Sequence, residues 1–281
     1  MVKPLSLLFL PKPNKKRKPI SQNLRHPDIL ALANTAGRVT VDDLAARFAV
    51  SVQTIRRDLT DLAAAGRLQR VHGGAILPSG STNIGYEDRR HLYSAEKQSI
   101  AKACATHIPD GASVFLNIGT STEAVARALL QHRRLLVVTN NMNVATILAA
   151  NENAEVIVTG SKLRRSDGGL IGHLASETIA KFKFDLAVIG CSALDPDGDL
   201  LDFDFQEVTV SQTILAQSRR SFLVADHSKF QRSAPARIVS LAALDMLFTD
   251  KVLDPGLAAK CQTWETNVIT TAWGALQRPC S

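Results

Sequence analysis

Two adjacent amphipathic segments near the amino terminus constrain the fold of this chain more than any other feature. Residues 39–50 and residues 51–59 each place apolar side chains at the spacing typical of a helix. Thr40 and Ser51 stand where a hydroxyl side chain would cap the first turn of each helix. The pattern therefore predicts a helix, a tight turn and a second helix over residues 39–58. The side chains expected to be buried are Val41, Leu44, Ala45, Phe48, Ile55, Leu59 and Leu62.

The second of these helices carries amide and guanidinium side chains on the side away from its apolar stripe. A helix with such groups in its first turns has the geometry needed to enter the major groove of DNA. A helix over residues 27–35 would complete a three-helix core, and Gly66 suits a helix end. The apolar runs around Gly73 and Gly74 predict a hairpin that would form a wing. The residues expected to contact DNA are Ser51, Gln53, Thr54, Arg56, Arg57, Arg67, Arg70 and His72.

The positive charge of the chain is concentrated in the same region. Residues 1–90 hold 15 Lys or Arg against 7 Asp or Glu, whereas residues 91–281 hold 18 against 19, in a chain of net charge +7. Because basic side chains release counterions from phosphates, this distribution favours a double-stranded DNA partner for the amino-terminal end. The alternative for the second helix is an ordinary surface helix with a basic end.

Composition divides the chain further. We expect a disordered basic extension at 1–22, a winged helix-turn-helix domain at 23–78, a linker at 79–90, a ligand-sensing domain at 91–253 and a carboxyl-terminal segment at 254–281. The extension could act as a non-specific DNA arm, and it could equally be a dispensable tail or precede the true start codon. Its run LSLLFL is too short to span a bilayer, which predicts a cytoplasmic protein without a membrane partner. The four cysteines lack metal-ligand spacing, so neither a metal nor another cofactor is expected.

Beyond the linker, apolar strand candidates alternate with helical segments. This alternation predicts an α/β domain with a Rossmann-like, doubly wound parallel sheet. In such a sheet the carboxyl ends of the strands share one edge, and ligands bind there. A polar loop follows each candidate strand, so five loops are expected to converge on that edge. The strands are predicted at residues 113–118, 135–139, 155–159, 184–189 and 221–225.

The loop after the first strand has the composition of an anion site. It supplies a glycine and three hydroxyl side chains before a helix, whose free N–H groups and dipole favour a phosphate. Such residues are also common at any strand-to-helix turn, but cations on neighbouring loops could complete the site. The acidic run over residues 195–204 does not match a calcium loop, and we interpret it as turn residues, some of whose carboxylates could accept hydroxyl groups of a ligand. The cations are Lys162, Arg164, Arg165 and Lys229.

Several motifs resemble the DeoR family of regulators over roughly residues 24–252. The segments RHPDILAL, SVQTIRRDL and RVHGGA resemble its winged helix-turn-helix, and TNNMNVA, LRRSDGGLIG, LDFDFQEV and VADHSKFQR resemble its sugar-phosphate sensor domain. The resemblance implies a repressor that binds operator DNA as a homo-oligomer, dimer or tetramer, and a sensor similar in fold to ribose-5-phosphate isomerase. The effector-binding residues that it implies are Gly119, Thr120, Ser121, Thr122, Asn140, Asn141, Arg164, Asp167, Glu207 and Lys229.

The sensor motifs are most similar to family members that respond to glycerol 3-phosphate, which is therefore the favoured effector. Another phosphorylated sugar or polyol is the first alternative. The second is an active sugar-phosphate isomerase, with Glu207 as general base and Lys229 as its electrostatic partner. Asn117 stands where the family commonly has aspartate, so we leave it out of the expected site.

Overall fold

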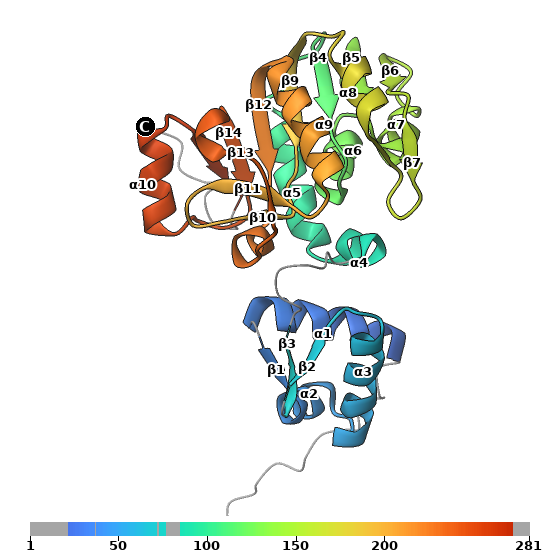
Figure 1. Ribbon diagram of the computed structural model, residues 1–281, viewed down its shortest axis with the longest axis vertical. Coiled ribbons are helices and arrows are strands. Elements are labelled where there is room, and N and C mark those ends of the chain that lie inside the picture. The colour runs from blue at the N-terminus through green and yellow to red at the C-terminus, as the bar shows by residue number, and fades with distance from the viewer. Residues whose placement is uncertain (1–21, 37, 72, 77–84, 272–281) are drawn as a thin grey trace, which may run out of the picture.

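The computed structural model describes residues 22–36, 38–71, 73–76 and 85–271 (Figure 1). At the amino-terminal end, three helices and a three-stranded antiparallel sheet of order β1-β3-β2 form a winged helix-turn-helix domain. Its elements are α1 (Gln22–Ala36), β1 (Arg38–Thr40), α2 (Val41–Phe48), α3 (Val52–Ala64), β2 (Gln69–Val71) and β3 (Gly74–Ile76).

The predicted helix-turn-helix is confirmed together with both of its caps. The Thr40 hydroxyl accepts a hydrogen bond from the backbone N–H of Asp43 at 3.2 Å, and that of Ser51 accepts one from Thr54 N–H at 3.1 Å. Each bond satisfies an N–H group that the first turn of a helix leaves open. All the side chains expected to be buried belong to the core of this domain, with Ile29, Leu30 and Ala33 from α1.

Two features of this domain differ from the sequence-based expectation. Helix α1 begins at Gln22 and contains Pro27, where we expected the helix to start. The wing also has a third strand, β1, which pairs with β3. This pairing requires a glycine at position 74, because a Cβ atom there would lie 2.0 Å from the Val39 carbonyl oxygen.

The second domain contains a seven-stranded, entirely parallel sheet of order β15-β14-β12-β9-β4-β5-β6. Successive residues of its strands face opposite sides, so Val114 and Leu116 of β4 enter one core and Phe115 enters the other. The strands are β4 (Ser113–Leu116), β5 (Leu135–Thr139), β6 (Ala154–Val158), β9 (Phe184–Ile189), β12 (Ser218–Val224), β14 (Met246–Thr249) and β15 (Asn267–Thr270).

Helices cover both faces of the sheet, which confirms the doubly wound architecture. Helices α5 (Ser94–Ala105), α6 (Thr120–Ala128) and α7 (Met142–Leu148) contribute to one core. The opposite core contains side chains of α8 (His173–Ile179), α9 (Phe205–Ala216) and α10 (Pro255–Thr263). The remaining elements are β7 (Lys162–Arg164), β8 (Gly169–Ile171), β10 (Ala193–Leu194), β11 (Asp199–Asp202), β13 (Ala236–Ser240) and the short 3-10 helices η1 (His227–Gln231) and η2 (Leu241–Ala243).

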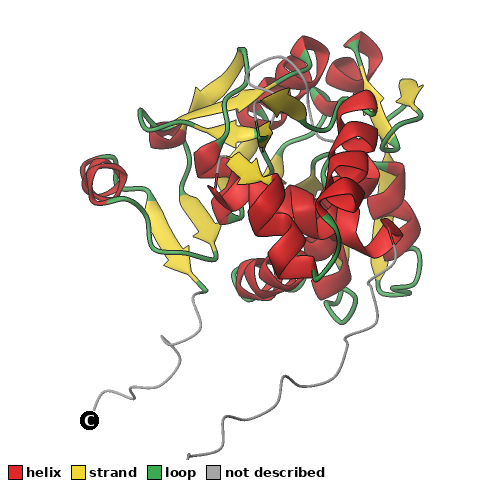
Figure 2. Cartoon of the chain, turned by 90° about the horizontal axis from the view of Figure 1, so that it is seen from below, coloured by secondary structure: helices red, strands yellow, loops and turns green. Residues whose placement is uncertain are grey.

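The sheet continues beyond residue 253, where we placed the end of the sensing domain. Helix α10 and strand β15 follow, and β15 pairs in parallel with β14 from Asn267 to Thr270. Both lie at the left margin of Figure 2, which agrees with β15 being an edge strand. At the other boundary, the expected linker at 79–90 ends in a short helix, α4 (Tyr86–His91). Residues 1–21 and 77–84 lie outside the described part of the chain.

Candidate functional site

The predicted DNA-contacting residues of α3 lie on one exposed side of the helix. Gln53, Arg56 and Arg57 are exposed, while Ile55 and Leu59 of the same helix are fully buried. Ser51 and Thr54 meet at the helix start, with their hydroxyl oxygens 2.8 Å apart. The first two turns of α3 therefore present an amide and two guanidinium groups to solvent, as a helix that reads the major groove requires.

The wing lies against the same helix. The Arg70 guanidinium of β2 donates to the Arg56 carbonyl oxygen at 3.0 Å and to the Thr60 hydroxyl at 3.3 Å. This contact brings one more exposed cation next to α3. Arg67 is half-buried in the segment between α3 and β2, and the predicted contact residue His72 lies outside the described residues.

In the second domain, the predicted phosphate loop forms the turn from β4 into α6. Gly119 precedes α6 with φ +142°, a conformation that favours glycine. The Thr122 hydroxyl donates to the carbonyl oxygens of Asn117 and Gly119, both at 2.7 Å. The Asn117 side chain donates to the Ser211 hydroxyl at 2.9 Å and accepts the N–H of Ile118 at 2.7 Å, so both ends of its amide already have partners within the protein. Ser121 is buried, and Thr120 is half-buried.

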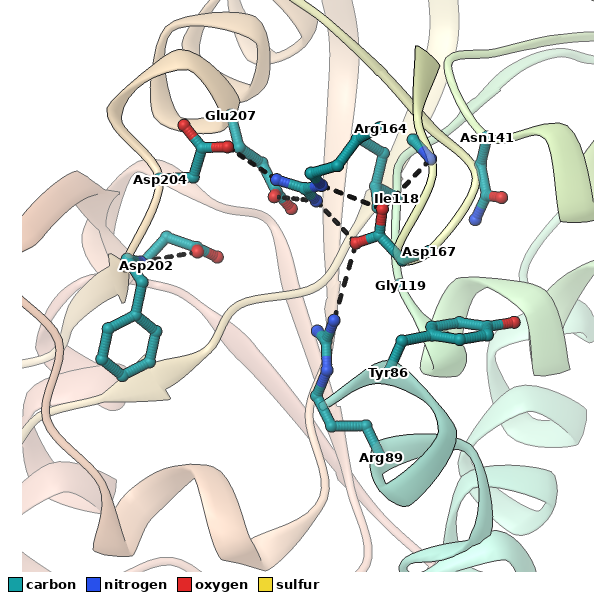
Figure 3. Close-up of polar contacts among 12 residues, drawn as sticks. Tyr86, Arg89, Ile118, Gly119, Asn141, Arg164, Asp167, Asp202, Asp204 and Glu207 are labelled. Atoms are coloured by element: carbon teal, nitrogen blue, oxygen red, sulfur yellow. Dashed lines mark hydrogen bonds and ion pairs between the residues drawn. The ribbon is translucent and has the colours of Figure 1, made fainter. Parts of the chain in front are cut away.

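Arg164 is the centre of an acidic cluster at the same edge (Figure 3). Its guanidinium donates to both carboxylate oxygens of Asp167, at 2.9 and 2.7 Å, to Asp204 at 2.7 Å and to Glu207 at 2.6 Å. These partners come from the β7–β8 turn and from the start of α9. Bidentate pairs of this kind fix both groups in one geometry.

The acidic cluster holds more carboxylates than one arginine can neutralise. Burial and the nearby charge of Asp202 raise the pKa of Glu207 to about 7, although Arg164 acts in the opposite direction. Burial lowers the pKa of the Arg164 guanidinium, but its bonds to Asp167 and Glu207 outweigh this effect and raise it above the usual value. The cluster therefore suits hydrogen-bond donors, such as hydroxyl groups, better than a second anion.

Two asparagines from the turn between β5 and α7 add amide groups to this edge. Asn140 donates to the Leu170 carbonyl oxygen at 3.3 Å, while its own side-chain oxygen is buried without a hydrogen-bond partner. Asn141 accepts the N–H of Asn143 at 2.9 Å as the cap of α7, and its side-chain nitrogen is likewise buried and unpaired. Buried polar groups normally find partners, so one acceptor and one donor are available here to a ligand.

A cationic cluster of Lys97, Lys229 and Arg232 lies around Asp226, and against the effect of burial these three charges lower the pKa of its carboxyl group. None of the three forms a salt bridge with a carboxylate of the described residues, and Arg232 Nε is buried without a partner. Burial and the charge of Arg232 lower the pKa of Lys229 to about 7. Burial also lowers the pKa of Lys97 to about 8, against the opposing effect of Asp226. Because these cations are buried and close together, the cluster favours an anion.

The predicted effector residues thus fall into an acidic part and a basic part, and the structure adds residues to both. Lys97 and Arg232 join the basic cluster, while Arg89 of α4 lies 3.6 Å from the Asp167 carboxylate. Arg232 follows Lys229 by one turn in the quoted motif VADHSKFQR, so the sequence held a signal for it. Lys97 lies in a polar helix and Arg89 in the expected linker, where no local pattern marked them. The exposed Lys162 and Arg165 belong to neither cluster.

The acidic run over residues 195–204 forms a turn only at its start, where Asp195 and Asp197 lie between β10 and β11. Asp199 and Asp202 belong to β11, and Asp204 caps α9. Asp195 accepts the N–H groups of Asp197 at 3.0 Å and of Asp199 at 2.9 Å. Within the described residues, no group of three or more His, Cys, Asp or Glu is arranged to hold a metal ion, and no helix is long and apolar enough to cross a bilayer. Cys104, Cys191 and Cys261 are buried free thiols, and Cys280 lies outside the described residues.

A cavity of about 400 Å³ lies on the outer side of α4, α5 and α6. It is lined by cations, including Arg90, Lys102 and Arg127, and no carboxylate is among its lining residues. Of the predicted effector residues only Thr120 reaches it. This outer cavity shares Lys97 with the cationic cluster, but no residue of the acidic cluster lines it.

Comparison with known proteins agrees with this organisation. A DeoR-like helix-turn-helix domain matches residues 25–80, and a DeoR C terminal sensor domain matches residues 93–251. The chain is 46% identical over 233 residues to the glycerol-3-phosphate regulon repressor of Haemophilus influenzae, covering 83% of this chain and 91% of that protein. It is 44% identical over 231 residues to the repressor of the same name from Escherichia coli, covering 82% and 92% respectively.

Among solved structures, ribose 5-phosphate isomerase A from Methanocaldococcus jannaschii aligns with a TM-score of 0.38 at 13% identity. That alignment covers 49% of this chain and 55% of the isomerase. The two family matches and the identity to the curated repressors extend over most of the sequence. This chain therefore belongs to the DeoR family of transcriptional regulators.

Proposed function

We propose that this protein is a DNA-binding repressor that leaves its operator when a small phosphorylated polyol, most favourably glycerol 3-phosphate, occupies the rim of the sensor sheet. The observation that carries the proposal is the division of that rim into a cationic and an acidic part. A phosphorylated polyol has the matching polarity, with a dianion at one end and hydroxyl donors at the other. The names of the two curated relatives support the same class of effector.

In this proposal the phosphate lies between the start of α6 and the cationic cluster. The loop from Gly119 to Thr122 would supply N–H groups and hydroxyls, and Lys229 would supply charge. The hydroxyl groups would donate to carboxylates of the acidic cluster and bond with Asn140 and Asn141. The full set of proposed effector ligands remains Gly119, Thr120, Ser121, Thr122, Asn140, Asn141, Arg164, Asp167, Glu207 and Lys229.

The DNA-binding half of the proposal assigns α3 to the major groove and the wing to the neighbouring backbone. Arg56 and Arg57 are exposed on α3 and would supply phosphate and base contacts. One such helix reads one half-site, so we propose a homo-oligomer, dimer or tetramer, on a two-fold symmetric operator. Large apolar side chains exposed on contacting sensor helices, Leu174 of α8 at 60% and Phe205 of α9 at 74%, support association. Light scattering after gel filtration measures the molar mass of the oligomer and so the number of its subunits.

Release follows if the effector binds the operator-competent arrangement less tightly than the other arrangement. A coupling of about 1–3 kcal/mol would weaken operator binding roughly 5- to 150-fold. To test the proposal, duplexes that bind the protein are first selected from a random library. The duplex with the highest affinity is then labelled with a fluorophore and used as the operator. Glycerol 3-phosphate is then expected to lower operator affinity in an anisotropy titration, while glycerol and inorganic phosphate at equal concentration leave it nearly unchanged.

Two results would contradict the proposal. If no selected duplex binds better than random DNA at any salt concentration, the protein is no sequence-specific repressor. If ribose or fructose phosphates release the operator and glycerol 3-phosphate does not, the effector is another sugar phosphate. An isomerase would convert ribose 5-phosphate when incubated with it, and NMR of that mixture is expected to show no product.

A further inference from the structure

Helix α4 is the first element of the sensor domain after the winged helix, and it is attached directly to residues of the effector rim. The Tyr86 hydroxyl donates to the buried Glu123 carboxylate of α6, at 3.0 and 3.1 Å from its two oxygens. Asn143 donates to the Tyr86 oxygen at 2.9 Å and to the Asp167 carbonyl oxygen at 2.9 Å. Two steps of hydrogen bonding therefore join the chain that leaves the DNA-binding domain to the β7–β8 turn.

Arg89 of the same helix reaches into the rim itself (Figure 3). Its guanidinium lies 3.6 Å from the Asp167 carboxylate, and its Nε is buried without a hydrogen-bond partner. The Arg89 carbonyl oxygen accepts a hydrogen bond from Lys97 and one from the Thr120 hydroxyl at 3.4 Å. The backbone of Arg89 thus lies beside Lys97 and Thr120 of the proposed phosphate site, and its side chain lies beside Asp167 of the acidic cluster.

The contact between Arg89 and Asp167 is the weakest ion pair of the acidic cluster. Asp167 keeps two bonds of 2.9 and 2.7 Å to Arg164 without it. Arg89 also lies close enough to Lys97 and Arg232 for the like charges to repel one another. An anion next to the cationic cluster would relieve this repulsion and offer the guanidinium a charge-assisted hydrogen bond. A bound phosphate would therefore compete well for Arg89.

We propose that Arg89 is an anion ligand of the effector site, and that its shift from Asp167 to the bound phosphate moves α4 and so passes effector occupancy to the DNA-binding domain. The inference rests on the proposed function and deepens it. The effector then binds more tightly to the state in which α4 has moved, which is the differential affinity that any allosteric release requires.

The test compares Arg89→Ala and Arg89→Lys with Arg90→Ala in the full-length protein. Arg90 is the matched control, because it is the adjacent cation of the same helix but is exposed and lines the outer cavity. Two quantities are measured for each variant: the dissociation constant for glycerol 3-phosphate by calorimetry, and the operator affinity with and without saturating effector. Thermal unfolding and basal operator binding report whether each variant is folded.

We expect Arg89→Ala to bind glycerol 3-phosphate at least about tenfold more weakly, the usual scale for a lost charge-assisted hydrogen bond. Its operator affinity at saturating effector should change by less than about twofold, against the 5- to 150-fold expected of the wild type. Arg89→Lys, which keeps the charge, should recover part of the affinity. Arg90→Ala should match the wild type in both measurements.

If the wild type responds to glycerol 3-phosphate, three results would overturn the inference. Arg89→Ala could bind glycerol 3-phosphate with wild-type affinity, which would show that Arg89 is not an anion ligand. It could also bind the effector weakly but still release the operator fully at saturating effector, which would show that Arg89 does not couple the two sites through α4. Loss of effector binding in Arg90→Ala instead would place the anion in the outer cavity. A wild-type protein that ignores glycerol 3-phosphate would refute the proposed function first, and the role of Arg89 would fall with it.

Discussion

Lys229 is a buried lysine that the proposed anion site uses in its charged form, although burial disfavours that form. Burial, with the charge of Arg232, lowers its pKa from 10.5 to about 7, and burial lowers that of Lys97 to about 8. The second pKa of a phosphate monoester lies near 6. Between these values the ligand is a dianion and the lysines are protonated. Effector affinity should therefore be highest near pH 6.5–7 and fall as the pH rises to 9, which calorimetry at several pH values measures.

The folding stability that depends on Lys229 changes with pH in the opposite direction to the effector affinity. Because the folded-state pKa of Lys229 lies below its unfolded value, the penalty for the buried charge is full below pH 7 and disappears as the pH rises toward 10.5. Lys229→Arg keeps its charge across this range, so its effector affinity should vary less with pH. An affinity that rises from pH 7 to 9 in the wild type would argue against a phosphate in the cationic cluster.

Arg56 is the residue with which to test the DNA-binding surface. Replacement by alanine removes an exposed guanidinium from α3 without touching the buried stripe. Loss of one specific base contact costs about 1–3 kcal/mol, so operator affinity should fall roughly 5- to 150-fold. Glycerol 3-phosphate affinity should stay the same. Arg219→Ala, which removes another exposed cation in the sensor domain, is the control; equal operator binding by Arg56→Ala and wild type would refute the assignment.

Local pattern predicted some of these residues and missed others for a physical reason. Helix caps and glycine turns depend on neighbours within three or four residues, so Thr40, Ser51 and Gly119 were identified from the sequence. Arg89 lies 78 positions from Asp167, its partner in the rim. Lys97 is a cluster member only because α5 packs against β12, the strand that leads to Lys229 and Arg232. Such partners become visible only once the sheet has brought distant loops together.

At the scale of single elements, α1 and α3 are joined by a buried ion pair. Arg25 donates to Asp58 at 2.8 and 3.2 Å, and both side chains are nearly inaccessible to solvent. Removing one partner leaves a buried charge uncompensated, which typically costs 3–5 kcal/mol. Asp58→Asn should destabilise the winged helix by about this amount in urea unfolding followed by circular dichroism, and should weaken operator binding at 37 °C.

The matched control for this pair is Asp28→Asn, which removes an exposed carboxylate from α1. A double variant with Arg25→Met and Asp58→Leu replaces the pair by apolar side chains of similar volume and should regain most of the stability. If Asp58→Asn unfolds at the same urea concentration as the wild type, the ion pair makes no net contribution to the stability of the domain.

Strands with strong apolar patterns were predicted best. The expected ranges for β5 and β9, residues 135–139 and 184–189, coincide with the observed ones. Strand β15 was missed because it is short, half-buried and at the edge of the sheet, with only one apolar pair. Helix α4 was assigned to the linker because it has six residues and is held by tertiary contacts more than by its own propensity.

At the scale of the whole molecule, the order of elements was the most predictable property. Alternating strands and helices imply a parallel sheet, and a parallel sheet brings all its following loops to one edge. That argument brought the segments that hold Asn140, Arg164, Glu207 and Lys229 to one edge, and the family resemblance selected these residues within them. It did not predict that the edge separates into acidic and basic parts, because loop conformation decides which charges face one another.

The polarity of this rim has a consequence for how the family diversifies. The basic part is built from α5, η1 and the residue after it, whereas the acidic part comes from the β7–β8 turn and the start of α9. Under the proposed function, substitutions in the second group would change the preference for one carbon skeleton over another, while the residues that bind the phosphate stay the same. A relative that senses another phosphorylated compound would then differ mainly in the acidic cluster.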